Sequence, residues 1–261
     1  ATRSAGMQSD KYGKIEDMVI ALRMVTPSGT IVTRTVPNSS NGIDVRRLCV
    51  GSEGILGVIT ELTMQVHRLP EYKVFEGWLF PDFESGVAAI HECMRMGIMP
   101  MITRLNDPGK TALSAAFKKP DTGLKAQIGA ALKWYLRTIK GFDFTQCCMM
   151  TTACEGDYDT FHQQRRESAY IFKRHRGVCL GEGPGRSFQE AKYDFPHVRD
   201  YLMNRGVMGD VSETATTWDN LLTLYTHTLE NIRQAIRDTG ADPWVGCHIS
   251  HNYHTGASLY F

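Results

Sequence analysis

The pattern of apolar and polar positions divides the chain into two parts that meet near Leu69-Pro70. Before this point, apolar residues alternate with polar ones or run in short segments between turns, which is typical of antiparallel strands. The strands expected here are Asp17 to Met24, Thr30 to Val36 and Glu61 to Val66, and one helical turn is expected over Val45 to Val50. The first part is therefore predicted to be β-rich.

After Tyr72 the pattern changes to strands that alternate with helices. The expected strands are Val74 to Phe80, Ile102 to Leu105, Met149 to Cys154, Val178 to Leu180, Val245 to Asn252 and Ala257 to Phe261. The expected helices are Pro81 to about Met96, Lys125 to Ile139, Tyr158 to Arg174 and Trp218 to Thr239. All but Tyr158 to Arg174 are marked by apolar residues at helical spacing on one face. This alternation predicts an α+β fold with an antiparallel sheet.

Composition excludes several classes of protein. The chain has 261 residues, 42% of them hydrophobic and 22% charged, which is ordinary for a globular protein. A net charge of +1 gives no reason to expect a nucleic-acid partner. No apolar run approaches the ~20 residues that span a bilayer. Seven cysteines without a CxxC pair suit a reducing compartment.

A glycine-rich run, Gly51 to Glu61, is the strongest local signal in the first part. Its glycines, Gly51, Gly54 and Gly57, let the backbone approach a ligand and present N–H groups to an anion. By itself such a run indicates either a phosphate-binding loop or an ordinary turn before a strand. The chain also begins inside a motif and stops on a predicted strand, so we expect it to be a fragment of a longer protein.

The motifs around this run carry a resemblance to a known family. Thr2 to Met7, Tyr12 to Val19, Val25 to Gly29, the glycine-rich run and Leu69 to Tyr72 occur in the order found in the second half of the FAD-binding domain of vanillyl-alcohol-oxidase-type flavoproteins. Further along, the segments that resemble the alkyldihydroxyacetonephosphate synthase family are Thr103 to Asp107, Val198 to Asp200, Ser212 to Thr214 and Tyr253 to Phe261.

The resemblance implies a fold and a cofactor. Residues 1–68 are expected to form the second half of a PCMH-type FAD-binding domain, and residues 69–261 an incomplete α+β cap or substrate domain. The implied FAD contacts are Thr2, Arg3, Ser4, Ala5, Glu53, Gly54, Ile55, Leu56, Gly57, Val58 and Ile59, with assistance from Ile15, Glu16 and Asp17. Ile55 departs from the family, which usually has a threonine there, so one phosphate contact is in doubt.

Two arginines are candidates for anion binding. Arg104 interrupts an apolar strand, where a charge is costly unless it is paired. Its residue context allows either a salt bridge, with Asp107 or with a glutamate, or a clamp on an anionic substrate group, for which a guanidinium is suited. Arg199 by context alone is a solvated surface residue. The resemblance implies that Arg104 contributes to catalysis and that Arg199 binds the substrate phosphate.

Tyr260 lies on the last predicted strand, with Ser258 on the same face. A tyrosine there is usually a packing residue, but the resemblance makes Tyr260 the proton-transferring catalytic residue. Nearby, His248, His251 and His254 form an HxxHxxH pattern that suggests zinc. Regular strand alternation would point His251 away from the other two, so no metal site is expected and a place in the lining of the flavin pocket is preferred.

The function implied by the resemblance is the ether-bond-forming step of ether-lipid synthesis. In the family, the acyl group of acyl-dihydroxyacetone phosphate is exchanged for a long-chain fatty alcohol through a covalent flavin N5 adduct, without net redox. The alternatives are an FAD-linked 2-hydroxy-acid dehydrogenase of the D-lactate type, in which Arg104 would bind a carboxylate, and a non-catalytic binding piece with an empty flavin cleft.

The remaining expectations concern partners and location. The helix Lys125 to Lys140 is basic and amphipathic, which indicates either a packed surface helix or contact with a membrane surface. The implied location is the luminal membrane surface of a peroxisome or glycosome, with a targeting signal outside this chain, and a homodimer is allowed.

Overall fold

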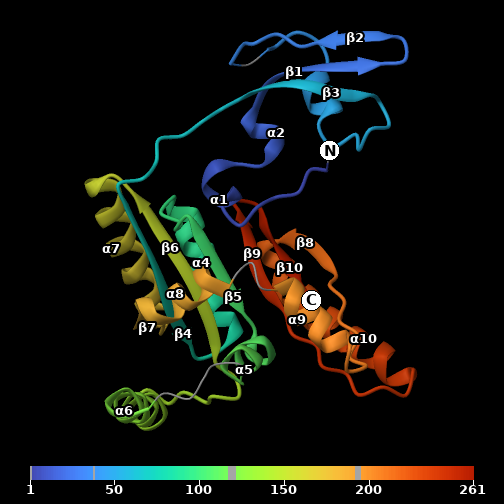
Figure 1. Ribbon diagram of the computed structural model, residues 1–261. Coiled ribbons are helices and arrows are strands. Elements are labelled where there is room, and N and C mark those ends of the chain that lie inside the picture. The colour runs from blue at the N-terminus through green and yellow to red at the C-terminus, as the bar shows by residue number, and fades with distance from the viewer. Residues whose placement is uncertain (1, 38, 117–121, 192–194) are drawn as a thin grey trace. The chain divides into compact units, whose positions relative to one another are not determined.

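The computed structural model describes residues 2–37, 39–116, 122–191 and 195–261, which fall into two compact units, residues 1–70 and 71–261. Figure 1 shows the first unit in blue and cyan and the second in green to red. Each unit has its own sheet and is described separately. No helix in the described part of the chain is long and apolar enough to cross a membrane.

The first unit is a three-stranded antiparallel sheet with short helices. Its strands β1 (Val19–Thr26), β2 (Gly29–Val32) and β3 (Val58–Met64) follow the spatial order β2-β1-β3. The helices are α1 (Ser9–Tyr12), α2 (Ile15–Met18) and α3 (Val45–Cys49). Strands β1 and β2 form a hairpin with Pro27-Ser28 in its turn, because Thr26 pairs with Gly29.

The predicted boundaries in this unit are partly wrong. Strand β1 begins at Val19 rather than Asp17, because Asp17 belongs to α2 and its carboxylate accepts a hydrogen bond from the Lys14 N–H. Strand β2 ends at Val32, so it is shorter than expected. The helical turn from Val45 is confirmed and is capped by the Asp44 carboxylate.

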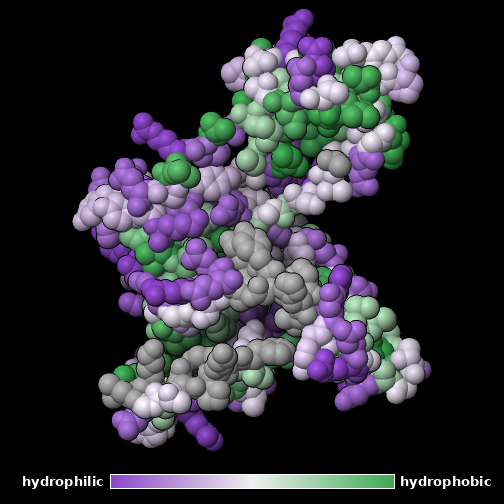
Figure 2. Space-filling view, viewed as in Figure 1, coloured by the Kyte–Doolittle hydropathy of each residue, from purple (hydrophilic) through white to green (hydrophobic). Residues whose placement is uncertain are grey.

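Many apolar side chains of this unit are exposed. Its buried cluster consists of Val19, Leu22, Met24, Cys49 and Val50. Figure 2 shows apolar side chains gathered over this part of the molecule, and those with the largest exposed fractions are Val32, Ile43, Ile55, Val58, Val66 and Leu69. An exposed apolar surface of this extent is typical of a contact site for a protein, a ligand or a membrane.

The second unit is built on a seven-stranded sheet in which every neighbouring pair is antiparallel. The spatial order is β7-β4-β6-β5-β9-β10-β8. The strands are β4 (Tyr72–Phe80), β5 (Ile102–Asn106), β6 (Cys148–Gly156), β7 (Val178–Gly181), β8 (Glu213–Thr217), β9 (His248–Tyr253) and β10 (Gly256–Tyr260). The predicted α+β class with an antiparallel sheet is confirmed.

One face of this sheet forms the main core. Side chains at the same level across the strands, Trp78, Met150, Leu105, Ile249 and Leu259, are all buried in one cluster. The helices that supply partners to this cluster are α4 (Phe83–Met96), α7 (Tyr158–Arg174) and α10 (Leu221–Asp238). The first two begin at aspartate caps, as a polar residue before an apolar-periodic run predicts.

The other face is partly covered by α8 (Glu182–Ala191). This helix lies against β4 so closely that a Cβ at Gly185 would come within 2.5 Å of the Phe75 backbone. Pro184 packs in the same way on Gly77, which has no side chain to obstruct it. The helix covers the β4 side of the face, and the residues of β5, β9, β10 and β8 on this face carry mostly polar groups.

Several elements of the second unit were not predicted. They are α5 (Pro108–Ala116), α8, α9 (Phe195–Met203) and β8. The expected helix from Trp218 begins with a 3-10 turn, Trp218–Asn220, before α10. The expected strand from Val245 begins only at His248, because residues 245–247 pass over the core as irregular chain. Helix α6 (Leu124–Thr138) agrees with its prediction within one residue at each end.

Candidate active site

The glycine-rich loop of the first unit adopts the backbone that its composition predicts. Gly51, Gly54 and Gly57 have φ values of 88°, 88° and 154°, and the intervening Glu53 is left-handed at 52°. A Cβ at Gly57 would strike the carbonyl of Val25, so that glycine is required by packing. A Cβ at Gly54 would meet nothing within 4 Å, so the loop presents open backbone there, as a phosphate-binding loop must.

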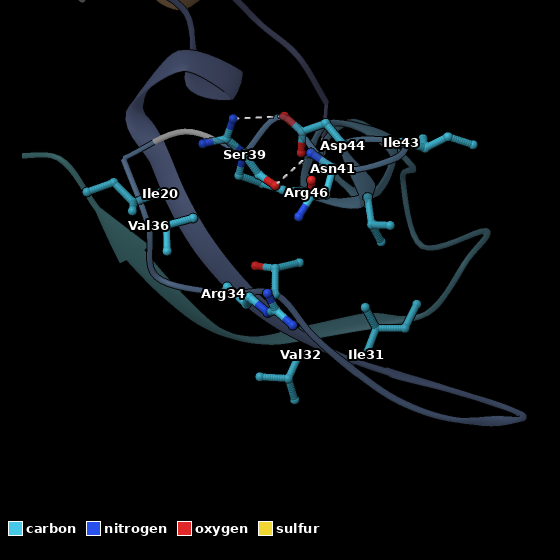
Figure 3. Close-up of a pocket in the computed structure, with 12 residues that line it drawn as sticks. Ile20, Ile31, Val32, Arg34, Val36, Ser39, Asn41, Ile43, Asp44 and Arg46 are labelled. Atoms are coloured by element: carbon cyan, nitrogen blue, oxygen red, sulfur yellow. Dashed lines mark hydrogen bonds and ion pairs between the residues drawn. The ribbon is translucent and has the colours of Figure 1, made fainter.

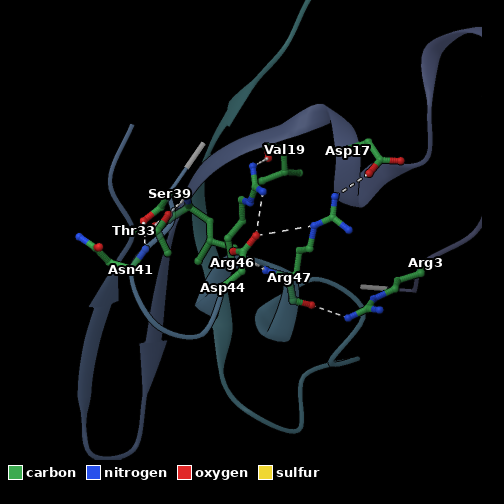
Figure 4. Close-up of polar contacts among 10 residues, drawn as sticks. Arg3, Asp17, Val19, Thr33, Ser39, Asn41, Asp44, Arg46 and Arg47 are labelled. Atoms are coloured by element: carbon green, nitrogen blue, oxygen red, sulfur yellow. Dashed lines mark hydrogen bonds and ion pairs between the residues drawn. The ribbon is translucent and has the colours of Figure 1, made fainter. Parts of the chain in front are cut away.

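Arg3 joins the N-terminal segment to the chain just before the glycine-rich loop (Figure 4). Its guanidinium donates to the carbonyl of Val50 at 2.7 Å and also to the carbonyl of Arg47. A Cβ at Gly51 would come within 2.5 Å of the Arg3 side chain. The role of Arg3 in the structure is therefore to hold the N-terminal segment against the start of the glycine-rich loop.

The other predicted FAD contacts lie on the surface of this unit. Thr2 and Ser4 expose their hydroxyls, whose oxygens lie 3.0 Å apart. Ile55 exposes 88% of its surface and Val58 67%, and Leu56 is also exposed. Ile59 instead packs against the small core. The exposed backbone at Gly54 and the small N-terminal side chains fit a dinucleotide, whereas Ile59 serves packing.

A hollow of about 400 Å³ lies elsewhere in this unit, between β2, the segment after it and α3 (Figure 3). Ile31, Val32 and Val36 line it from one side, and the ion pair of Arg46 with Asp44, at 2.9 Å, lies on the other. None of the predicted FAD-binding residues lines it. We assign it no chemistry.

The polar face of the large sheet brings together side chains that are distant in sequence. Asn106, His248, Tyr260 and Glu213 are successive cross-strand partners on β5, β9, β10 and β8. They form a polar row across the strands, with Arg104 two residues from Asn106 on β5. The carbonyl oxygen of the Asn106 side chain is buried and has no hydrogen-bond partner among the described residues.

A β-bulge in β9 corrects the expected orientation of the histidines. Tyr260 pairs with His248 and Leu259 with Ile249, but Ser258 pairs with His251, so Ser250 is an extra residue in the strand. The extra residue places His248 and His251 on the same face. Both rings contact Tyr260, with centroids 4.9 and 5.5 Å from the phenol ring.

Tyr260 is held by groups on both neighbouring strands. Its hydroxyl is hydrogen-bonded to the Glu213 carboxylate, its cross-strand partner. Burial, together with this bond and the nearby charge, raises the pKa of the Tyr260 phenol above its usual value. The residue therefore carries its proton at neutral pH, with the Glu213 carboxylate beside its hydroxyl.

Lys110, which the sequence did not single out, lies beside this row. Its Nζ is 2.7 Å from Nδ1 of His248. Burial and the charge of Arg104 lower the pKa of Lys110 to about 8. Burial, followed by the charges of Arg104 and Lys110, lowers the pKa of His248 well below its usual value, so the imidazole is neutral. The helix-start signal Asp107-Pro108 would have revealed the α5 position of Lys110.

Arg104 does not form a salt bridge with Asp107, which was one of the interpretations of its residue context. The Asp107 carboxylate instead accepts from the Lys110 backbone N–H at 2.8 Å and from the Tyr225 hydroxyl at 3.2 Å. The Arg104 guanidinium lies over the ring of Phe188 on α8, 5.5 Å from its centroid. Burial lowers the pKa of Arg104 to about 10, still far above neutrality. The residue is a half-buried cation next to Lys110 and His248.

Arg199 lies on α9 and its contacts resemble those of a surface residue. Its guanidinium donates to the carboxylate of Asp200 at 3.1 Å, and both side chains are more than half exposed. The structure thus brings Arg104 and Tyr260 into one polar group, whereas the contacts of Arg199 are local. Binding of a phosphate by Arg199 would require exchange of the Asp200 carboxylate for the ligand.

Comparison with known proteins places this site in a family. Residues 69–261 match the family described as FAD linked oxidases, C-terminal domain. The chain therefore belongs to the FAD-linked oxidase family, whose cofactor is FAD.

More specifically, the whole chain is 37% identical to the alkyldihydroxyacetonephosphate synthases of Dictyostelium discoideum and Trypanosoma brucei brucei, covering 43% and 42% of those proteins. A solved alkyldihydroxyacetonephosphate synthase superimposes on the entire chain with a TM-score of 0.84 at 36% identity, over 46% of its own length. The resemblance expected from the motifs is confirmed, and the chain spans less than half the length of these relatives.

Proposed function

We propose that this chain supplies the cap and part of the flavin cradle of an alkylglycerone-phosphate synthase. That enzyme would exchange the acyl group of acyl-dihydroxyacetone phosphate for a long-chain fatty alcohol, without net redox. The observation that carries the proposal is the polar row around Tyr260, on a chain that is similar from end to end to enzymes named alkyldihydroxyacetonephosphate synthase.

The residues that would hold FAD are the small N-terminal side chains and the open backbone around Gly54. When bound, the flavin would supply its N5 as a nucleophile toward the carbon that carries the acyloxy group. The protein's contribution is to bind the two substrates, orient them and move a proton.

Tyr260 is the proton-transferring residue in this proposal. The acyl group departs as a carboxylate in one step, and in a later step the alcohol must lose its hydroxyl proton as the new ether bond forms. The phenol oxygen can accept the alcohol proton as its own proton passes to Glu213, to which it is already hydrogen-bonded. Tyr260 and Glu213 would then act as one proton-accepting pair.

Each of the two candidate arginines would bind a different anionic group of the reaction. Arg104 is half-buried beside His248, where a cation stabilises an anion more strongly than it would in water. We propose that Arg104 attracts the carboxylate that forms as the acyl group leaves. Arg199, exposed on α9, would bind the substrate phosphate in place of Asp200.

Helix α6 supports a peripheral membrane role in the same proposal. Ile128, Leu132, Tyr135 and Ile139 form an exposed apolar stripe along it, whereas Leu136 beside the stripe is buried against Leu79 and Phe142. The exposed cations on its far flank are Lys133, Arg137 and Lys140. Such a helix would lie in the interface of a bilayer from which long-chain substrates are drawn, at the luminal face of a peroxisome or glycosome.

The test uses the intact protein loaded with FAD. Labelled fatty alcohol is incubated with acyl-dihydroxyacetone phosphate, and the ether product and released fatty acid are quantified. The proposal predicts one fatty acid released for each ether formed, with no dye reduced. If the protein instead reduces a dye with a 2-hydroxy acid and forms no ether, the dehydrogenase alternative replaces it. If it retains flavin but does neither, the non-catalytic alternative stands.

A further inference from the structure

The backbone at Lys110 is fixed by hydrogen bonds, and its side chain extends from there to the polar row. Its backbone N–H donates to the Asp107 carboxylate, and the Asp107 N–H donates to the carbonyl of Cys247 at 2.9 Å. Asp107 exposes only 1% of its surface and also accepts from Tyr225 on α10. The first turn of α5 is thereby fixed to the chain that leads into His248. The side chain of Lys110 therefore reaches His248 from a defined direction.

The contact between Lys110 and His248 defines the chemical form of the imidazole. A lysine ammonium has only donors, so a 2.7 Å contact with Nδ1 requires a lone pair on that nitrogen. His248 is neutral, since two cations flank it and its ring is buried. Its single proton is therefore on Nε2. The ring in this form stacks on Tyr260 with an interplanar angle of 20°.

We propose that Lys110 is a positioning residue of the active site. Its ammonium fixes His248 as the Nε2–H tautomer and holds the imidazole against the ring of Tyr260, so that the phenol keeps its orientation toward Glu213. Lys110 itself does not touch a reacting atom. This inference rests on the proposed function for its kinetic consequence, but the tautomer of His248 is a property of the protein alone.

The proposal has a pH dependence whose sign follows from Lys110. The pKa of Lys110 is lowered to about 8, so the ammonium that orients His248 is present below pH 8 and is lost as the pH rises through that value. The titratable and charged groups around the contact, from every element packed on it, are Arg104, Asp107, Glu213, Tyr225, Cys247, His251 and Tyr260. Burial raises the pKa of Asp107, although its hydrogen bonds and the charge of Lys110 act in the opposite direction. Burial together with nearby negative charge raises the pKa of Tyr225, Cys247 and Tyr260. The cysteine and the two tyrosines therefore keep their protons up to pH values well above 8.

The structural arm of the test needs no enzymatic activity. Solid-state NMR of the intact, FAD-loaded protein labelled with ¹⁵N-histidine distinguishes the two neutral tautomers, and the His248→Gln variant identifies the His248 signals among those of the nine histidines. At pH 7 we expect an unprotonated Nδ1 in the wild type and a mixture of tautomers in Lys110→Met. A proton on Nδ1 in the wild type, or an unchanged spectrum in Lys110→Met, overturns the proposal.

The kinetic arm uses the exchange assay with two variants. Lys110→Met removes the donor and should lower kcat by about 10- to 100-fold while KM changes little, as for loss of a charged hydrogen bond that only orients a group. Lys110→Arg keeps the donor charged and should retain most of the activity, with the alkaline decline near pH 8 moved upward. Lys173→Met, an exposed lysine on α7, is the matched control and should behave as wild type.

Folding defects and failure of the proposed function are separable from failure of this inference. Each variant is checked for wild-type flavin content and thermal midpoint. If Lys110→Met does not fold, the pH profile of Lys110→Arg decides, and an unchanged alkaline limb overturns the role of Lys110. If the wild type exchanges no alcohol, the proposed function fails. The NMR experiment still decides whether Lys110 fixes the tautomer of His248.

Discussion

The imidazole of His248 lies nearly parallel to the phenol of Tyr260, with ring centroids 4.9 Å apart and planes inclined by 20°. The two residues are cross-strand partners on β9 and β10, and Glu213 is the partner of Tyr260 on the other side. The tyrosine is thus confined by an aromatic face on one strand and a carboxylate on the next. Its freedom is restricted without any covalent link.

Replacement of the Tyr260 hydroxyl tests its role in proton transfer. Tyr260→Phe keeps the ring and its stacking on His248, so folding and flavin content should be unchanged. Turnover in the alcohol exchange assay should fall by roughly two to four powers of ten, the range that general acid–base catalysis provides. Tyr201→Phe, in which an exposed tyrosine is altered, is the control. Exchange by Tyr260→Phe at the wild-type rate would reduce Tyr260 to a packing residue.

Arg199 should affect binding more than chemistry. Arg199→Lys keeps the charge but loses the planar fork that suits a phosphate, so KM for acyl-dihydroxyacetone phosphate should rise several-fold more than kcat falls. Asp200→Asn removes the carboxylate that is hydrogen-bonded to the Arg199 guanidinium, so this change should lower that KM. Steady-state kinetics measures both. A KM unaffected by either change would mean that the phosphate binds elsewhere.

Gly54 and Gly57 should respond differently to the same substitution. Gly57→Ala places a Cβ against the Val25 carbonyl, so the protein should be destabilised by a few kcal/mol, as for other strained backbone sites. Gly54→Ala has open space around its Cβ, so stability should fall by only about 1 kcal/mol whereas flavin retention drops. Thermal melts and flavin absorbance separate the two. Full flavin content in Gly54→Ala would show that FAD does not approach this backbone.

The chain alone should bind FAD weakly or not at all. Its first unit provides one glycine-rich loop and one small-residue segment, and much of its apolar surface is exposed. Isothermal titration of residues 1–261 with FAD measures this directly. Tight, stoichiometric binding would contradict it, because that result would make residues 1–261 a complete cradle.

Charge substitutions on α6 test the membrane contact. Ile128→Asp combined with Ile139→Asp places anions in the exposed apolar stripe and should reduce sedimentation with anionic vesicles by about tenfold or more. Thr138→Asp, at an exposed polar position of the same helix, is the control for added charge. If the double variant binds vesicles as the wild type does, α6 is not the contact.

Much of the fold could be predicted because its signals are local. Both ends of α7 agree with the prediction, and its aspartate cap is a signal that the neighbouring sequence contains. The hairpin at Pro27-Ser28 likewise follows from its turn residues. Helix α8 was missed because Gly183, Pro184 and Gly185 read as a loop. Small residues are favoured in α8 because the helix lies close against β4, and this contact between distant parts of the chain cannot be inferred from the local sequence.

The site was predictable to a lesser degree. The resemblance pointed to Tyr260 and Arg104, and the structure places both in one polar group, but their roles remain predictions. Lys110 was missed because its importance comes from a contact 138 positions away in sequence. The orientation of His251 was wrong because regular alternation was assumed, and no residue pattern announces the bulge.

The bulge in β9 means that the spacing of two residues along the strand does not reveal which face of the sheet they occupy. His248 and His251 are three positions apart, which would place them on opposite faces of a regular strand, yet both rings contact Tyr260. Because Ser250 is the extra residue, its deletion would leave His248, Ile249 and His251 in regular alternation, with the two histidines still on one face. A homologue one residue shorter here can therefore keep the same pair of histidines around its tyrosine.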